Sequence, residues 1–199
     1  GPPDLILVTG DIAFKADPKE YEQASQWLEQ LLTTVNADKN RLYLAPGNHD
    51  VDRIKALSGP TRRTIHKSLR ADPPDLDEYL DKPEELAPIW SKLEAYSEFA
   101  TAYAAPKLTP ENPYWVCTHD TSLGAIVIAG LNTNLLSFDN QDDPKNLAFG
   151  ARQLQQAIHS QPRDSLLLVL QHHPPGWLVD GSKLCAMLQD RAHVLFCGH

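Results

Sequence analysis

Short apolar runs recur along the chain, and each is followed at once by a polar cluster. These runs are DLILVTGD at 4–11, RLYLAP at 41–46, SLLLVLQHH at 165–173 and HVLFCGH at 193–199. Apolar runs of this length, bounded by glycine, proline or polar residues, are typical of strands buried on both faces of a sheet. Helical periodicity separates them, so the chain is expected to form one layered α/β domain spanning residues 1–199.

The segment 18–35 shows the clearest helical pattern. Asp17-Pro18 provides an N-cap followed by proline at the first helical position. Apolar side chains then follow at helical spacing, namely Tyr21, Ala24, Trp27, Leu28, Leu31 and Leu32. We therefore predict an amphipathic helix over 18–35 that joins the strands at 4–11 and 41–46 as a right-handed βαβ unit.

The remaining elements are less regular. Residues 58–88 are rich in proline and charge and lack a clear period, so we expect an insertion (about 53–110) with partial helix, lying over one end of the sheet. Helices are expected over 88–103, 149–158 and 183–191. The segments YWVCTHD and GAIVIAGLNT are close enough in sequence to pair as antiparallel strands.

Composition excludes several classes of protein. Hydrophobic residues make up 42% and charged residues 22%, and the apolar runs are too short to cross a bilayer, which favours a cytoplasmic protein without membrane contact. Three cysteines without C-x-x-C spacing are expected to be buried, reduced thiols. The net charge of −8 argues against binding of long duplex nucleic acid. One run, residues 53–70, carries six Lys or Arg and no acid. It is either a solvated helix face or a rim that attracts phosphate, with Arg62 and Arg63 as candidate rim residues.

The polar clusters after the strands are GD at 10–11, GNHD at 47–50, QHHPP at 171–175 and GH at 198–199. Each cluster alone has an ordinary structural explanation. GD is typical of a turn and GNHD of a loop, QHHPP is consistent with a strand that ends at prolines, and GH alone indicates nothing specific. Ligands bind at the carboxyl ends of strands in α/β sheets, so neighbouring strands would bring Asp11, Asn48, His172 or His173, and His199 together. One carboxylate, one amide oxygen and imidazoles suit Mn²⁺, Fe²⁺ or Zn²⁺ better than Ca²⁺ or Mg²⁺.

The ordered series GD, GNHD, HHPP and GH resembles the calcineurin-like metallophosphoesterases, and GDIAFKADPKEYEQA, LNTN and FGARQLQQAI extend the likeness over most of the chain. The resemblance implies two packed mixed β-sheets flanked by helices in four layers, with two metal ions above the strand ends. It implies that Asp11 bridges both metals and that Asn48, His172 and His199 bind the second. His172 is chosen over His173 because the ligand of that family lies two residues before the proline, which leaves His173 outside the ligand shell.

The resemblance assigns His49 a catalytic role: it would face the phosphate and protonate the leaving oxygen or stabilise its charge. In several relatives a carboxylate three residues beyond the aspartate of the Gly-Asp pair orients this histidine. Phe14 occupies that position here, so the orienting group is unassigned. Asp50 is a candidate substitute, although a loop-fixing role suits it better. Two metals about 3.5–4 Å apart would neutralise phosphate charge and generate a hydroxide near neutral pH.

Two family elements are missing: an Asp-x-His motif before Asp11, and a second histidine after His199. We therefore expect a fragment truncated at both ends, with at most one bound metal, little or no activity alone, and an unfilled sheet edge through which copies associate. The intact parent is expected to be a metal-dependent phosphoesterase, with diesters favoured over monoesters. Its expected substrates are phosphorylated small molecules, nucleotides or nucleic-acid ends. The alternative is a non-catalytic scaffold of the same fold for protein interaction.

Overall fold

The computed structural model describes residues 1–71, 76–122, 124–138, 141, 143–162 and 164–199. Strand β1 (Ile6–Val8), helix α1 (Pro18–Val35) and strand β2 (Leu42–Leu44) form the predicted βαβ unit, with β1 and β2 parallel. Helix α1 begins where the sequence predicted, because Asp17 caps it and accepts a hydrogen bond from the backbone N–H of Lys19 at 2.9 Å. Glu20 completes a capping box by accepting from the Asp17 N–H.

The apolar face of α1 is narrower than its periodicity indicates. Tyr21, Leu28 and Leu32 are buried, whereas the side chain of Trp27 is 60% exposed. The expectation that Trp27 belongs to the buried stripe is wrong, because the helix rotates Tyr21, Leu28 and Leu32 toward the sheet and leaves Trp27 at the edge of that face. There Trp27 lines an open cavity of about 480 Å³, together with Val8, Ala24 and Phe14.

The second sheet has the order β3-β4-β5-β6. Strands β3 (Trp115–Thr121) and β4 (Gly124–Gly130) are antiparallel, as predicted, and β4, β5 (Leu166–Gln171) and β6 (Val194–Cys197) run parallel. Helix α7 (Ala151–His159) and helix α8 (Gly181–Arg191) begin within two residues of their predicted starts. The sheet is therefore mixed, and its three parallel strands all direct their carboxyl ends the same way.

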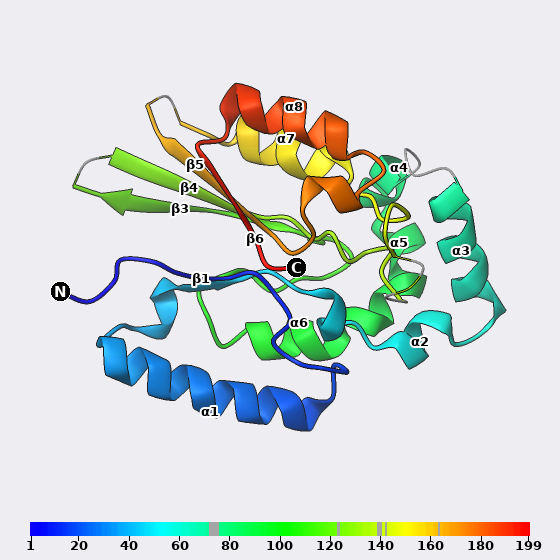
Figure 1. The fold of residues 1–199 in the computed structure, drawn as a ribbon, viewed down its shortest axis with the longest axis horizontal. Coiled ribbons are helices and arrows are strands. Elements are labelled where there is room, and N and C mark those ends of the chain that lie inside the picture. The colour runs from blue at the N-terminus through cyan, green and yellow to red at the C-terminus, as the bar shows by residue number, and fades with distance from the viewer. Residues whose placement is uncertain (72–75, 123, 139–140, 142, 163) are drawn as a thin grey trace.

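The two sheets and their helices form layers. Figure 1 shows α7 and α8 over one face of the four-stranded sheet, while α1 and α6 lie on the opposite side of the molecule, beyond β1 and β2. Buried side chains from both sheets, such as Leu42, Leu44, Val127 and Val169, belong to one continuous core. The indole N–H of Trp115 in β3 also donates to the carbonyl of Leu44 in β2 at 3.0 Å. The expected fold of two packed sheets flanked by helices is confirmed.

The insertion is more helical than the sequence indicates. It contains α2 (Arg53–Leu57), α3 (Pro60–Ala71), α4 (Leu76–Leu80), α5 (Pro83–Trp90), a 3-10 turn at Ser91–Leu93, and α6 (Glu94–Ala100). The single helix expected over 88–103 is wrong, because the chain forms α5 and α6 joined by the 3-10 turn. Burial of Leu69, Leu76, Leu86 and Ile89 shows that tertiary packing, rather than local periodicity, stabilises these short helices.

All three cysteines are free thiols. Cys117 and Cys185 are partly buried, whereas Cys197 is exposed. The expectation of a buried thiol is therefore wrong for Cys197, which lies at the end of a strand, β6, whose own side chains are mostly exposed. Within the described ranges, no helix combines the length and the apolar character that crossing a bilayer requires.

Candidate metal centre

The four polar clusters all follow the carboxyl ends of parallel strands. Gly10-Asp11 follows β1, Gly47–Asp50 follows β2, His172-His173 follows β5, and Gly198-His199 follows β6. Because β1 is parallel to β2 and β5 is parallel to β6, each pair of clusters is delivered to the same edge of its sheet. The backbone N–H of His199 donates to the carbonyl of His172 at 3.0 Å, which joins the last two clusters directly.

Glycines allow the loops from the two sheets to approach closely. Gly10 has φ +94°, and a Cβ there would lie 2.5 Å from the Cα of Gly47 and 2.8 Å from the carbonyl carbon of Pro46. A Cβ on Gly198 would overlap the carbonyl oxygen of Thr9. Asp11 itself has φ 57°, a left-handed conformation that aspartate tolerates better than bulky residues do. The strand ends therefore meet at distances that side chains at these glycines would prevent.

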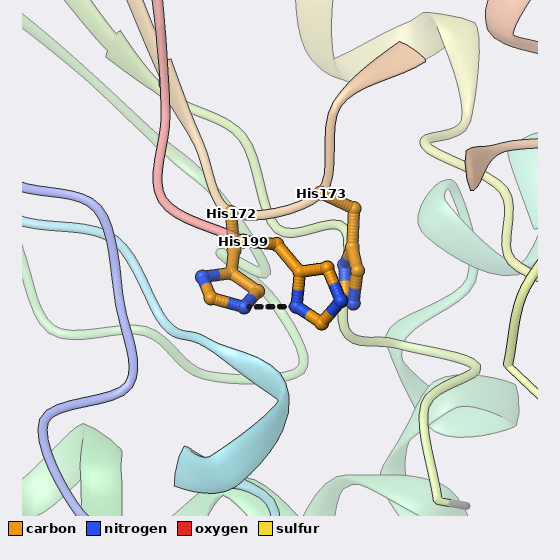
Figure 2. Close-up of side chains that lie close together, drawn as sticks. All are labelled: His172, His173 and His199. Atoms are coloured by element: carbon orange, nitrogen blue, oxygen red, sulfur yellow. Dashed lines mark hydrogen bonds between the residues drawn. The ribbon is translucent and has the colours of Figure 1, made fainter. Parts of the chain in front are cut away.

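Four predicted ligands converge on one point. The Nε2 atom of His172 lies 2.8 Å from Asn48 Oδ1, 3.1 Å from His199 Nδ1 and 3.3 Å from Asp11 Oδ1. His199 Nδ1 lies 3.1 Å from Asn48 Oδ1. Figure 2 shows the imidazoles of His172 and His199 facing each other through these nitrogens, next to the ring of His173. The convergence expected from the strand ends is thus present in the fold.

The electronic character of these atoms suits a cation. His172 Nδ1 lies 2.8 Å from the carbonyl oxygen of Thr9, which can only accept, so Nδ1 carries the ring hydrogen and Nε2 carries a lone pair. Burial lowers the pKa of His172, which favours this neutral form. The Oδ1 atoms of Asp11 and Asn48 also offer lone pairs, as His199 Nδ1 does when its hydrogen is on Nε2. These residues therefore fit a divalent metal ion, and mixed oxygen and nitrogen donors favour Mn²⁺, Fe²⁺ or Zn²⁺.

His173 is fully buried beside this cluster. Its Nδ1 lies 3.0 Å from the hydroxyl of Thr133, and Trp177 packs against its ring at a centroid distance of 5.8 Å. Burial lowers its pKa to about 2, with further contributions from His172 and His199, so the ring is neutral. Among the described residues, His172, His173 and His199 form a group in which one nitrogen of each ring lies within 4.8 Å of the others.

His49 lies next to the ligands and is oriented by Phe14. Its backbone N–H donates to Asp11 Oδ1 at 3.1 Å, and its Nδ1 donates to the carbonyl oxygen of Phe14 at 2.9 Å. The ring of Phe14 stacks on the imidazole, with centroids 5.0 Å apart and an interplanar angle of 19°. Sequence reasoning could not identify this orienting group, because the atom that replaces the carboxylate of the relatives is a backbone oxygen, which every residue type has.

Asp50 holds the loops after β1 and β2 together through its side-chain hydrogen bonds. Its carboxylate accepts from the backbone N–H groups of Ile12, Ala13 and Gly47 and from the hydroxyl of Tyr21, at 2.8–3.3 Å. Burial raises the pKa of Asp50 to about 6, although the hydrogen bonds lower it again in part. Of the two roles considered for Asp50, the contacts favour the loop-fixing one, since they tie the loop after β1 to the loop after β2.

The two candidate rim arginines are held within the insertion. Arg62 Nε donates to the carbonyl of Pro88 at 2.8 Å, and Arg63 donates to the carbonyl of Leu57 at 3.1 Å. Both guanidinium groups therefore link α3 to neighbouring segments. A role of Arg62 and Arg63 at the substrate rim stays a prediction.

Comparison with known proteins gives two further findings. A family model described as calcineurin-like phosphoesterase matches residues 1–199. The chain is also similar to the uncharacterized metallophosphoesterase-like protein YydB of Bacillus subtilis (strain 168), with 26% identity over 180 residues, covering 87% of this chain and 35% of that protein. The chain thus spans about a third of the length of this relative. The family match over the full sequence, together with motifs that meet at one cluster, shows that the chain belongs to the calcineurin-like phosphoesterase family.

Proposed function

We propose that this protein is part of a metal-dependent hydrolase of phosphate esters, with diesters favoured over monoesters. The observation that carries the proposal is that the side-chain donor atoms of Asp11, Asn48 and His199 all lie 2.8–3.3 Å from His172 Nε2. The backbone N–H of His49 donates to Asp11 beside them. The family match supports phosphoester chemistry in particular over other metal-dependent reactions.

Asp11, Asn48, His172 and His199 would hold one divalent ion, of manganese, iron or zinc, and Asp11 would also contribute to a second one in the longer protein. When bound, such ions neutralise the charge of the non-bridging phosphate oxygens and lower the pKa of a water molecule from 15.7 toward about 7. The hydrogen bond from His172 Nδ1 to Thr9 fixes the ring so that Nε2 faces the ion.

His49 would bind the phosphate and protonate the leaving oxygen. The Phe14 carbonyl accepts from Nδ1, so Nε2 is the nitrogen that faces the reacting group and carries the transferred proton. Stacking of the Phe14 ring restricts rotation of the imidazole and removes water from one of its faces. The residues of the GNHD loop therefore have three different roles: Asn48 is a metal ligand, His49 donates the proton to the leaving oxygen, and Asp50 fixes the loop conformation.

The preference for diesters is supported by the insertion, whose helices follow the GNHD loop directly in the chain and would wall a cleft beside the site. We propose a phosphorylated small molecule, a nucleotide or a nucleic-acid end as the substrate, and the net charge of −8 disfavours a long duplex. A cytoplasmic location and self-association through a sheet edge stay predictions. In the described structure, β1 pairs on one side alone, with β2.

The proposal is tested with bis-p-nitrophenyl phosphate and p-nitrophenyl phosphate in the presence of Mn²⁺. We expect slow hydrolysis that is faster for the diester than for the monoester. EDTA should abolish this hydrolysis, and His49→Ala should remove it. His159→Ala is the matched control, because His159 lies exposed in the last turn of α7. Turnover that neither EDTA nor His49→Ala affects would contradict the proposal. No metal-dependent turnover in a form of the protein extended at both ends would favour the scaffold function.

A further inference from the structure

The histidines among the four predicted ligands differ in how their rings are held. His172 is buried, and its Nδ1 is hydrogen-bonded to the carbonyl oxygen of Thr9. His199 is exposed and follows β6, an edge strand whose own side chains are mostly exposed. Metal-binding histidines usually donate their second ring N–H to a protein group that fixes the ring. Within the described part of the chain, Nε2 of His199 makes no such hydrogen bond, so packing is what remains to orient this ring.

The closest ring contact of His199, within the described residues, is with the indole of Trp177. The two ring centroids are 4.1 Å apart and the interplanar angle is 70°, which is an edge-to-face arrangement. The rings of His172 and His173 lie farther from His199, at centroid distances of 5.0 and 5.1 Å. Aromatic rings favour edge-to-face contacts, so this contact stabilises the observed orientation of the imidazole.

The turn that carries Trp177 is itself well fixed. Pro174 and Pro175 restrict the backbone before it, and the chain then forms a 3-10 turn. The backbone N–H of Trp177 donates to the carbonyl of Pro174 at 2.9 Å, and its carbonyl accepts from the N–H of Lys145 at 2.8 Å. A Cβ on Gly181 would overlap the carbonyl oxygen of Pro175, because the start of α8 packs closely against the turn. Trp177 is therefore anchored on both sides, whereas His199 lies at the end of an exposed edge strand.

The orientation of the His199 ring decides whether this residue can be a ligand. Its Nδ1 lies 3.1 Å from His172 Nε2 and 3.1 Å from Asn48 Oδ1. Rotation of the ring by half a turn about its bond to Cβ would put a carbon atom in the place of Nδ1 and remove this donor from the site. A bulky ring packed against the imidazole opposes that rotation, because the ring needs free space to turn.

We propose that Trp177 is a positioning residue for the metal ligand His199, and that its indole keeps Nδ1 of the imidazole directed at the cation. This inference rests on the proposed function, because it requires a cation at the site. It assigns the two histidine ligands different supports. His172 is oriented by a hydrogen bond to a backbone carbonyl, and His199 is oriented by an aromatic contact.

Calorimetric titration with Mn²⁺ is the first test. Trp177→Ala removes the indole and Trp177→Phe keeps an aromatic ring. Val179→Ala is the control, because Val179 is an exposed apolar residue of the same loop. We expect Trp177→Ala to bind Mn²⁺ about tenfold more weakly or worse, since loss of a group that orients a metal ligand costs about 10–100-fold in affinity. Trp177→Phe and Val179→Ala should stay within about threefold of the unsubstituted protein, because neither removes the aromatic contact altogether.

Electron spin-echo spectra of bound Mn²⁺ in ¹⁵N-histidine-labelled protein distinguish positioning from a general structural role. Trp177→Ala at saturating Mn²⁺ should keep the coupling that His172→Gln abolishes and lose the coupling that His199→Gln abolishes. Trp177→Phe should show both couplings. Loss of both couplings in Trp177→Ala would show a general structural role and overturn the inference. Weaker binding of inorganic phosphate with both couplings intact would also overturn it, because Trp177 would then contact the anion.

Nuclear Overhauser spectra of the unsubstituted protein loaded with diamagnetic Zn²⁺ need no variant to fold. They should show contacts between the rings of Trp177 and His199, and the stacked rings of Phe14 and His49 provide the internal reference. Reference contacts without those of Trp177 and His199 would overturn the inference. If the unsubstituted protein binds neither Mn²⁺ nor Zn²⁺, the proposed function fails together with the inference, whereas binding that is insensitive to Trp177→Ala defeats the inference alone.

Discussion

Replacement of Gly10 by alanine tests whether the close approach of the two loops builds the site. Gly10 and Gly59 both have positive φ, +94° and +83°, so alanine at either position has a strained backbone. At Gly59 the new Cβ would meet nothing within 4 Å, whereas at Gly10 it would lie 2.5 Å from the Cα of Gly47. Gly59→Ala is therefore a matched control that isolates the backbone strain from the clash.

The expected magnitudes follow from these geometries. Left-handed backbone costs alanine about 1–2 kcal/mol, which is the full expected effect of Gly59→Ala. The nearest atom to the new Cβ is the backbone nitrogen of Gly47, at 2.4 Å. Ordinary contact begins at 3.4 Å, so the loops after β1 and β2 must separate by 3.4 − 2.4 = 1.0 Å in Gly10→Ala. Overpacking of this kind costs a further 1–3 kcal/mol, so the total expected loss is about 2–5 kcal/mol. Because the same shift moves Asp11 away from His49 and Asn48, we also expect Mn²⁺ affinity to fall more than tenfold.

Urea unfolding measures the first quantity, and calorimetric titration of the folded protein with Mn²⁺ measures the second. Gly59→Ala should lose about 1–2 kcal/mol of unfolding free energy and keep its Mn²⁺ affinity. If the two variants lose the same unfolding free energy and bind Mn²⁺ equally well, then the contact between the loops does not position the ligands, and the reasoning is refuted.

Three further predictions concern His49, Phe14 and His66. His49→Ala should lower the turnover of bis-p-nitrophenyl phosphate about 10²–10⁴-fold with Mn²⁺ affinity unchanged, because proton transfer is lost but no ligand is; an equal loss of Mn²⁺ binding would contradict this. Phe14→Ala keeps the carbonyl that accepts from His49 and removes the stacked ring, so steady-state kinetics should show a loss of about tenfold or less, and a loss equal to that of His49→Ala would be inconsistent with orientation by the backbone. Burial lowers the pKa of His66 to about 2, and the unfolded chain binds its proton near pH 6.5, so unfolding free energy should fall with decreasing pH below 6.5, by about 2 kcal/mol at pH 5. Urea unfolding at pH 7.5 and pH 5 should show a smaller decrease for His66→Phe than for the exposed control His159→Phe, and equal decreases would refute the assignment.

The parts of the fold that could be predicted are those specified by short-range signals. The start of helix α1 is predictable because Asp17 caps it, Pro18 occupies its first position, and Glu20 completes the capping box. The pairing of the clusters within each sheet was predictable because the carboxyl ends of neighbouring parallel strands share an edge. The approach of the two pairs to each other depends on how the two sheets pack, which the sequence pattern does not specify. The helices of the insertion were not predictable, because their stability depends on long-range contacts. One of these is the buried Lys92 side chain, whose Nζ donates to the carbonyls of Leu135 and Ser137.

Within the site, the convergence of Asp11, Asn48, His172 and His199 was predictable, and the groups that orient these side chains were not. Thr9, Phe14 and Thr133 act on His172, His49 and His173 through two backbone carbonyls and one hydroxyl. A backbone oxygen leaves no trace in the residue type, and Thr133 lies 40 residues before the histidine it contacts. Sequence patterns therefore indicate which polar side chains gather at the strand ends, while the contacts that orient these side chains come from backbone oxygens and from residues distant in sequence.

The central claim is that Asp11, Asn48, His172 and His199 together hold one divalent cation, and electron spin-echo spectroscopy of Mn²⁺ tests it most directly. In protein labelled with ¹⁵N-histidine, the account predicts bound Mn²⁺ with couplings from two imidazole nitrogens, one of which disappears in His172→Gln and the other in His199→Gln. Bound Mn²⁺ without nitrogen coupling, or with couplings that neither substitution changes, would contradict the account.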